Sequence, residues 1–185
     1  MIRAMLMTRH SMLAKQITAG HIDISNDQTG TETSSHHDIE VYRRARDKSE
    51  AEHFRSGRLE GFARSEVSYY DLLHQALNAC AGDGFRETTR LQPRLQVKID
   101  LLEGGTGKPE PQGLINIERQ KGGSDMAAKF NIDLFATDPA DGQLKVFRSG
   151  QLRNFDVTRN GYFDLLRACL NVAVKEGFYR RSRTS

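Results

Sequence analysis

One phrase occurs twice in this chain, as FRSGRLEGF at residues 54–62 and as FRSGQLRNF at residues 147–155. The two copies lie 93 residues apart, and the 32 residues that begin at each phrase align without a gap, with 14 identical positions. The same offset keeps matching apolar positions upstream to the N-terminus. A fixed period of this size indicates a duplicated structural unit. We therefore predict two units, residues 1–92 and 93–185, that fold together as one pseudo-twofold body.

The second unit is predicted to contain four strands followed by a helix. In residues 95–101, Val97, Ile99 and Leu101 alternate with polar residues, which is typical of a strand with one buried face. Shorter alternating runs separated by glycine and proline predict strands over 114–117, 130–134 and 144–146. The first unit repeats this pattern except at residues 47–53, DKSEAEH, where we predict a loop or a helix instead of the fourth strand.

Each unit ends in a predicted amphipathic helix. Apolar residues recur at positions i, i+3, i+4, i+7, i+8 and i+11, namely Tyr69, Leu72, Leu73, Ala76, Leu77 and Cys80, then Tyr162, Leu165, Leu166, Cys169, Leu170 and Ala173. Ser68 with Asp71 three residues later is typical of a capping box. Gly84 and Gly177 stand where a glycine commonly ends a helix. Both cysteines fall on these stripes, so we expect buried core thiols.

The fold class that follows is α+β, built from two ββββα units. A four-stranded sheet covered by one helix leaves its edges and one face open. The two units are therefore expected to pair, either by packing sheet on sheet or by extending one sheet, with the helices on the outside of antiparallel sheets. This order of elements is similar to that of the single-stranded nucleic-acid-binding proteins of the purine-rich-element type. The similarity is one of element order alone.

The composition is typical of a soluble globular protein, with 37% hydrophobic and 28% charged residues. No apolar run approaches the roughly 18 residues that a membrane span requires, so no membrane partner is expected. Two cysteines are too few for a disulfide scaffold, and we expect a reducing, cytoplasmic location. The basic, acid-free residues 1–22 could form a transit peptide. Their alignment with the strand predicted at 95–101 favours a structural segment.

Arginines provide the main argument for a ligand. The net charge is +3, and 19 arginines stand against 8 lysines, which favours bidentate contacts to phosphate. They gather after the third strand of the first unit, in the linker and in the tail 179–185. We expect a non-catalytic protein that binds nucleic acid through Arg43, Arg44, Arg46, Arg55, Arg148, Arg180, Arg181 and Arg183. Tyr42, Phe135 and Tyr179 are the rings that would stack on bases.

Two other classes of function stay open. The first is a structural or assembly subunit that uses exposed sheet edges for protein–protein contacts or self-association. The second is a metal-dependent enzyme that uses the histidines of the first unit, His10, His21, His36, His37, His53 and His74. No HxH or HExxH spacing occurs, so we expect neither a metal site nor catalysis. The segment GGTGKPE at 104–110 cannot open a phosphate-binding helix because of its proline, so no cofactor is expected.

Two local patterns need an interpretation. Asp71, His74 and Asn78 share one face of the first helix, but the second unit has Arg167 in place of the histidine. We therefore predict helix capping and a surface ion pair there instead of catalysis. The repeated phrase is predicted to form the turn between the last strand and the helix. Its glycine would supply a special φ angle, and its apolar residues would anchor the helix.

Overall fold

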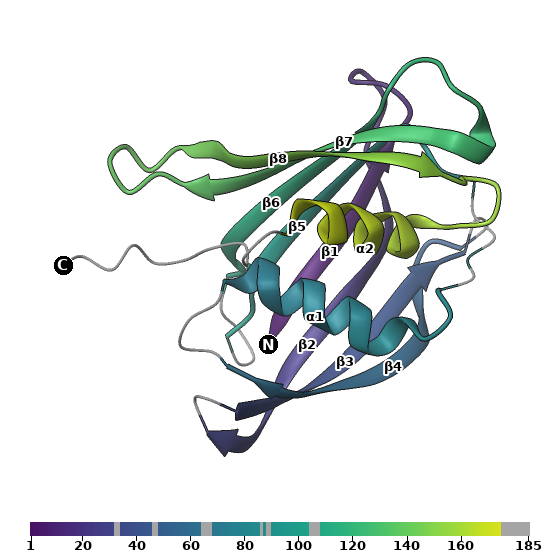
Figure 1. Ribbon diagram of the computed structural model, residues 1–185. Coiled ribbons are helices and arrows are strands. Elements are labelled where there is room, and N and C mark those ends of the chain that lie inside the picture. Colours follow the sequence, from purple (N-terminus) through teal and green to yellow (C-terminus); the bar gives the residue numbers. More distant parts are fainter. Residues whose placement is uncertain are drawn as a thin grey trace.

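The computed structural model describes residues 1–31, 34–45, 48–63, 68–85, 87, 90–103 and 108–174. The first half contains β1 (Ile2–Arg9), β2 (Ile17–Thr31), β3 (Ser34–Arg44), β4 (Ala51–Phe62) and α1 (Tyr69–Ala81). The second half contains β5 (Arg94–Leu101), β6 (Glu110–Arg119), the short 3₁₀ helix η2 (Asp125–Ala127), β7 (Ala128–Thr137), β8 (Leu144–Phe155) and α2 (Tyr162–Ala173). The mixed α+β class predicted from the sequence is confirmed (Figure 1).

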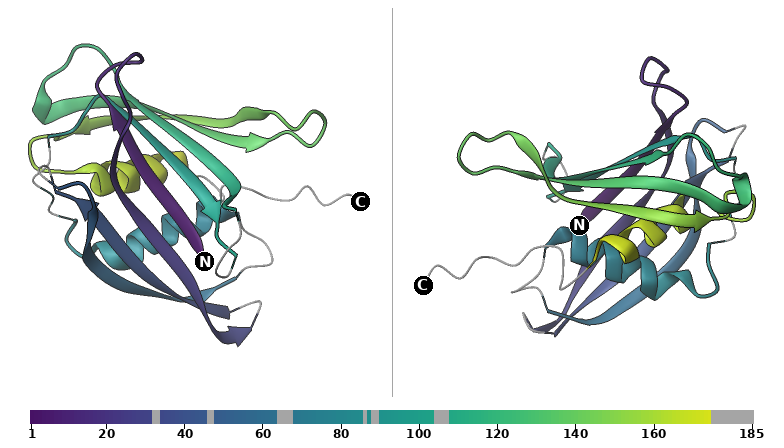
Figure 2. Two further views of the ribbon diagram at one scale, coloured as in Figure 1. Left: turned by 180° about the vertical axis from the view of Figure 1, so that it is seen from behind. Right: turned by 45° about the horizontal axis from the view of Figure 1, so that its top comes forward.

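All eight strands form one antiparallel sheet in the order β4-β3-β2-β1-β5-β6-β7-β8. The first strands of the two halves, β1 and β5, pair at its centre, and the last strands, β4 and β8, are its edges. Both helices pack side by side on one face (Figure 1), while Figure 2, left, looks onto the other face. Of the two arrangements left open by the sequence, the single extended sheet is therefore the correct one.

The register between β1 and β5 reproduces the offset found in the sequence. Met5 pairs with Lys98, which is the residue 93 positions further along the chain. Pairs at equal distances on either side of this point correspond at the same offset, from Ile2–Leu101 to Thr8–Leu95. The strand order and the central register are thus symmetric about Met5 and Lys98.

The hydrophobic core lies between the sheet and the two helices. Alternate strand residues such as Leu95, Val97 and Ile99 point toward the helices and are at most 2% exposed. The predicted helical stripes are confirmed except at Tyr69, which is only partly buried. Full burial of a Leu or Ile side chain contributes about 1.5–3 kcal/mol to the free energy of folding. The buried side chains of both halves form one continuous cluster, so the helices hold the two halves of the sheet together.

The edge strand of the first half is longer than the sequence suggests. β4 begins at Ala51, so the loop or helix predicted for residues 47–53 is wrong at its C-terminal end. In both edge strands a bulge adds one residue to the strand, Phe54 in β4 and Phe147 in β8. A bulge interrupts the period-two alternation. β8 has the same bulge but keeps Leu144 and Val146 where β4 has Ala51 and His53, so the lack of large apolar residues hides the strand at the start of β4.

The repeated phrase lies inside β4 and β8 and not at a turn, so the predicted role of its glycine is wrong. Neither Gly57 nor Gly150 has a positive φ angle. A Cβ atom on Gly57 would lie 2.5 Å from the Cβ of Cys80 in α1. A Cβ atom on Gly150 would lie 3.2 Å from Ile132 and 3.8 Å from Ala173 in α2. The glycine therefore allows each helix to approach its edge strand closely.

The start of α1 has the capping box predicted from the sequence. The Ser68 side chain accepts a hydrogen bond from the backbone N–H of Asp71, and the Asp71 carboxylate accepts one from the backbone N–H of Ser68. At the other end, the C-terminal cap is Gly82 and not the predicted Gly84. The second predicted cap, Gly177, lies outside the described residues.

The start of α2 is capped by the linker between the two halves. Gly161 occupies the N-cap position, and Glu87 Oε2 accepts a hydrogen bond from the backbone N–H of Phe163 at 2.9 Å. A Cβ atom on Gly161 would lie 2.2 Å from this carboxylate oxygen, so the glycine makes room for it. Burial raises the pKa of Glu87 to about 7, against the effect of the hydrogen bond from Phe163.

Candidate binding surface

The outer face of the sheet is the face opposite α1 and α2 (Figure 2, left), and the strand register places a row of residues there that crosses every described strand. The row follows from the strand register, because each member pairs with the next one on the neighbouring strand. From β4 to β8 this central row consists of His53, Tyr42, His21, Met5, Lys98, Leu114, Phe135 and Val146. Its two halves correspond residue by residue at the 93-residue offset.

The first half of the central row is a set of three packed rings. His21 stacks on Tyr42 with ring centroids 4.5 Å apart and an interplanar angle of 12°. His53 meets the other side of Tyr42 edge-on, with centroids 5.6 Å apart. Burial lowers the pKa of His21, against the attraction of the nearby Asp23 carboxylate. His21 is therefore neutral at pH 7 and packs as an uncharged ring.

Beyond Lys98, the second half of the central row is apolar. Leu114 and Phe135 are partly buried, and Val146 on the edge strand is 48% exposed. Leu144, two residues earlier on the same face of β8, is 52% exposed. Outside the central Met5–Lys98 pair, the first half of the row thus offers polar rings, whereas the second half offers hydrocarbon surface.

Charged side chains beside the central row have hydrogen-bond partners within the protein. Arg3 donates two hydrogen bonds of 2.7 Å to the carboxylate of Asp23 on the neighbouring strand, which pairs the two charges. The hydroxyl of Ser56 donates to Glu40 at 2.8 Å, and in the second half the hydroxyl of Ser149 donates to Asp133 in the same way. A hydroxyl group leaves the carboxylate its negative charge, so charge alone does not make this face a phosphate-binding surface.

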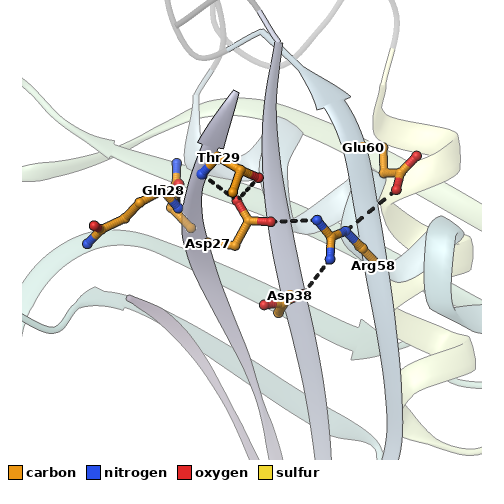
Figure 3. A network of polar contacts seen from close by, with 7 residues as sticks. Asp27, Gln28, Thr29, Asp38, Arg58 and Glu60 are labelled. Atoms are coloured by element: carbon orange, nitrogen blue, oxygen red, sulfur yellow. Dashed lines mark hydrogen bonds and ion pairs between the residues drawn. The ribbon is translucent and has the colours of Figure 1, made fainter. Parts of the chain in front are cut away.

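A second group of charges lies where β2, β3 and β4 run toward one end of the sheet (Figure 3). Arg58 in β4 lies 2.6 Å from Asp27, 3.5 Å from Glu60 and 3.8 Å from Asp38. The side-chain hydrogen bond from Thr29 lowers the pKa of Asp27, and the Arg58 guanidinium acts in the same direction. Three carboxylates around one guanidinium leave this end of the sheet acidic.

The arginines predicted after the third strand point to different sides of the sheet. Arg43 lies on the helix side, with its guanidinium 4.2 Å from the ring centre of Phe54. Arg44 follows on the opposite face, and its Nε donates to the backbone carbonyl of Lys48 at 2.7 Å. Arg44 is thus the predicted arginine that lies on the same face as the ring of Tyr42. Four other predicted residues, Arg46, Arg180, Arg181 and Arg183, lie outside the described residues.

The arginine of the repeated phrase donates hydrogen bonds to carbonyl groups at the C-terminal end of each helix. Arg55 Nη1 donates to the carbonyls of Cys80, Ala81 and Gly84 at 3.2, 2.7 and 2.9 Å. Its counterpart Arg148 donates to the carbonyl of the last α2 residue at 3.3 Å. A cation at a helix C-terminus satisfies carbonyls that have no partner within the helix. This structural role accounts for both arginines without a ligand.

The histidines do not assemble a metal centre in the part of the chain that the structure describes. No three His, Cys, Asp or Glu side chains gather there in a way that could hold a metal ion. His37 is buried and lies edge-on to Phe62, with ring centroids 5.6 Å apart. Its counterpart Phe130 meets Phe155 at 5.8 Å in the same geometry, so His37 fills a core position. Both cysteines are buried, as expected, and burial raises the pKa of Cys80 to about 11.

The Asp71, His74 and Asn78 line faces the other helix. Asp71 caps α1 as predicted, and His74 and Asn78 both contact Asn171 in α2. His74 Nε2 lies 2.6 Å from Asn171 Oδ1.

Neither described helix is long and apolar enough to cross a membrane.

Tyr42 and Phe135 can be identified from the sequence, but the row that connects them cannot. The alternation of each strand indicates which residues leave the core, while only the register shows which of them are neighbours. Comparison of the chain with protein-family models, with curated proteins and with solved structures found no match.

Proposed function

We propose that this chain is a non-catalytic binding protein that takes up single-stranded nucleic acid on the outer face of its sheet. The observation that carries the proposal is the central row, which crosses all eight strands with aromatic rings at two corresponding positions, Tyr42 and Phe135. Bases stack on such rings whatever their sequence, and each stacked base contributes about 1–3 kcal/mol. A single strand exposes its bases for this contact, whereas a duplex hides them.

We further infer that the chain arose by tandem duplication of a ββββα unit and is pseudo-twofold. The offset of 93 residues appears independently in the repeated phrase and in the Met5–Lys98 pairing. A twofold relation through this pair makes the outer face one continuous surface with two equivalent base positions. Lys98 supplies a positive charge at its centre.

Phosphate contacts in this proposal come from the margins of the surface. The pairing of Arg3 with Asp23 leaves little free positive charge beside the row. Arg44 near Tyr42, together with Arg46 and the tail arginines 180, 181 and 183, would supply the contacts that depend on salt. A cytoplasmic location belongs to the same proposal, since both cysteines are free thiols.

Fluorescence anisotropy with labelled single-stranded and duplex oligonucleotides tests the proposal. We expect binding of the single strand, and about tenfold weaker binding by Phe135→Ala, which corresponds to the loss of one stacked base. Thr137→Ala is the matched control, because Thr137 is an exposed residue of the same strand outside the row. Neutralising the three tail arginines should reduce the dependence of log K on log salt by about 2. No retention of any oligonucleotide at low salt would refute the proposal.

A protein ligand for the same face is the second candidate. It is favoured by two carboxylates beside the central row, Glu40 and Asp133, which repel phosphate but suit a polar protein surface. A structural or assembly subunit would use such a surface for protein contacts. Absence of oligonucleotide binding would leave this candidate as the stronger one.

A further inference from the structure

The loop between β1 and β2 presents hydrocarbon to solvent at its tip. The backbone N–H of Ala14 donates to the carbonyl of Ser11 at 3.2 Å, which closes a turn with Met12 and Leu13 at its two central positions. Their side chains are 58% and 99% exposed, respectively. The loop extends beyond the end of the sheet, at the top of the right-hand view in Figure 2. The fold therefore leaves two adjacent apolar side chains in water at a projecting point.

The sequence of the corresponding loop in the second half shows that the fold does not require apolar residues at this tip. At the 93-residue offset, Met12 and Leu13 correspond to Gly105 and Thr106. Because the two halves have the same order of strands, a side chain that folding requires should occur in both. The hydrocarbon at the β1–β2 tip therefore indicates a contact outside the chain.

Two more exposed apolar side chains lie at the same end of the sheet. Ile17, at the start of β2, is 51% exposed, and Met126, in the connection from β6 to β7, is 65% exposed. Arg9 pairs with Arg94, and Arg94 pairs with Glu118, so the β1–β2 loop and the β6–β7 connection leave the sheet at this end. Single exposed apolar residues are ordinary, whereas several at one end of a molecule mark a site of interaction.

Basic side chains lie beside the apolar tip. The guanidinium nitrogens of Arg9 and Arg94 lie 3.5 and 3.1 Å from the sulfur of Met12. Lys15, on the same loop, is exposed. Arg94 is paired with Glu118, whereas Arg9 and Lys15 form no ion pair among the described residues. The loop itself contains no acidic residue, so its surroundings carry net positive charge.

Basic residues also exceed acidic ones around Met126. Lys121 and Lys129 are exposed on either side of it in the sequence. The nearby Asp125 is paired with Arg119 at 2.7 Å, which leaves the two lysines in excess. Both exposed apolar segments at this end are thus accompanied by positive charge.

The other end of the sheet has the opposite charge. Arg58 is surrounded there by three carboxylates (Figure 3), and Lys145 lies between Asp138 and Asp141 at the turn from β7 to β8. Acidic groups outnumber basic ones in both clusters. Leu144 begins β8 beside this turn and is 52% exposed. A negatively charged surface attracts the end with the β1–β2 loop and repels this one.

We propose that this protein binds the surface of anionic lipid membranes by inserting the tip of its β1–β2 loop, Met12 and Leu13, among the lipid headgroups. Apolar side chains that enter the headgroup region act together with basic residues that attract anionic lipids in such a contact. Nucleic acid would use the basic groups but would leave the apolar tip in water. The contact requires no membrane-spanning segment, so the short apolar runs of the sequence do not oppose it. It uses one end of the sheet and does not depend on nucleic-acid binding at the central row.

Vesicle flotation with the full chain tests the proposal. We expect binding to phosphatidylcholine vesicles that contain about 30% phosphatidylserine, weaker binding to phosphatidylcholine alone, and loss of binding as the salt concentration rises. Leu13→Gln should weaken binding about tenfold, because one inserted leucine is lost. The matched control is Leu144→Gln, a change of the same kind at the acidic end, which should leave binding unchanged. No binding to either kind of vesicle, or equal effects of the two changes, would overturn the proposal.

A fluorescent label reports insertion directly. Both natural cysteines are buried, so a polarity-sensitive dye reacts with the new thiol of the Leu13→Cys variant. Its emission should shift to shorter wavelength on phosphatidylserine vesicles, and a dye on the Leu144→Cys variant should show no shift. Circular dichroism identifies a variant that fails to fold, and the same change at Met12 then takes its place. An unshifted emission at the loop, or a loss of oligonucleotide binding in Leu13→Gln with vesicle binding retained, would contradict insertion into lipid.

Discussion

Asn78 and Asn171 occupy the same position in the two halves and hydrogen-bond to each other across the helices, with Nδ2 of Asn78 3.2 Å from Oδ1 of Asn171. Around them, His74 reaches Asn171 at 2.6 Å and its counterpart Arg167 donates to Asn78 at 2.8 Å. These contacts interchange when the two halves are exchanged. The helix layer therefore shares the symmetry that the Met5–Lys98 pair gives to the sheet.

This polar contact between the helices should contribute measurably to stability. Asn78→Ala removes the acceptor of Arg167 and a donor to Asn171, and we expect a loss of about 1–2 kcal/mol in the free energy of unfolding. Urea denaturation measures the loss. Gln75→Ala is the control, because Gln75 is exposed on the same helix, and its effect should stay near zero. Equal effects of the two changes would contradict the contact.

The two glycines of the repeated phrase should differ in their tolerance of a methyl group. Gly57→Ala places a Cβ atom 2.5 Å from Cys80 and should cost about 1–3 kcal/mol. Gly150→Ala places it 3.2 Å from a side-chain methyl group of Ile132, which can move, so the cost should stay below about 1 kcal/mol. Thermal unfolding of both variants checks the order. The reverse order would show that helix approach is not what requires Gly57.

The end of α1 depends on Arg55. Arg55→Met retains the aliphatic part of the side chain but removes its hydrogen bonds to three carbonyls, and we expect a loss of about 1–2 kcal/mol. The control is Arg153→Met, since Arg153 is exposed on the other edge strand. Chemical denaturation of both variants gives the comparison. A loss of oligonucleotide binding without a loss of stability in Arg55→Met would instead assign this arginine to the ligand.

Stability should fall as the pH rises through neutrality because of Glu87. Its pKa is about 7 in the folded protein and 4.5 ordinarily, so the folded state holds the proton more tightly. This contribution is complete below pH 4.5 and is lost as the pH rises through about 7, by about 3 kcal/mol in all. Glu87→Gln should remove this loss, because the amide oxygen still accepts from Phe163 but carries no charge.

Denaturation curves between pH 5 and pH 8 measure the effect of Glu87→Gln. Glu110→Gln serves as the control, because Glu110 is exposed at the start of β6 and its loss should leave the slope unchanged. A slope that persists in Glu87→Gln would mean that another group titrates in this range.

Much of the fold follows from local patterns in the sequence. The alternation in β5 and β7 and the helical stripes depend on burial alone, and the sequence predicts them well. The start of β4 is not predicted because Ala51 and His53 stand where the other edge strand, β8, has the apolar Leu144 and Val146. Contacts between residues far apart in the sequence cannot be predicted for a different reason. Nothing near Gly161 indicates that Glu87, more than seventy residues earlier, caps the helix.

The sequence predicts individual residues of the candidate surface but not their arrangement in one row. Tyr42 and Phe135 correspond at the repeat offset and alternate with buried neighbours, which places them outside the core. That they belong to one line depends on five intervening pairings, including the Met5–Lys98 register. No single segment contains this information. The roles of Arg55 and Arg148 likewise depend on where the helices end over the edge strands.

The central pairing of β1 with β5 has a consequence for synthesis on the ribosome. Among the described strands β1 is made before all the others, and its second neighbour β5 follows about 90 residues later, which takes roughly 5–20 seconds at ordinary elongation rates. During that interval the completed first half presents β1 as an open edge, and its natural partner β5 shares with β1 the alternation of buried apolar residues, Ile2, Ala4 and Leu6 against Leu95, Val97 and Ile99. Neighbouring nascent chains on one messenger therefore compete with the second half of their own chain for this strand. Slower translation of residues 93–101 should increase the yield of strand-exchanged dimers.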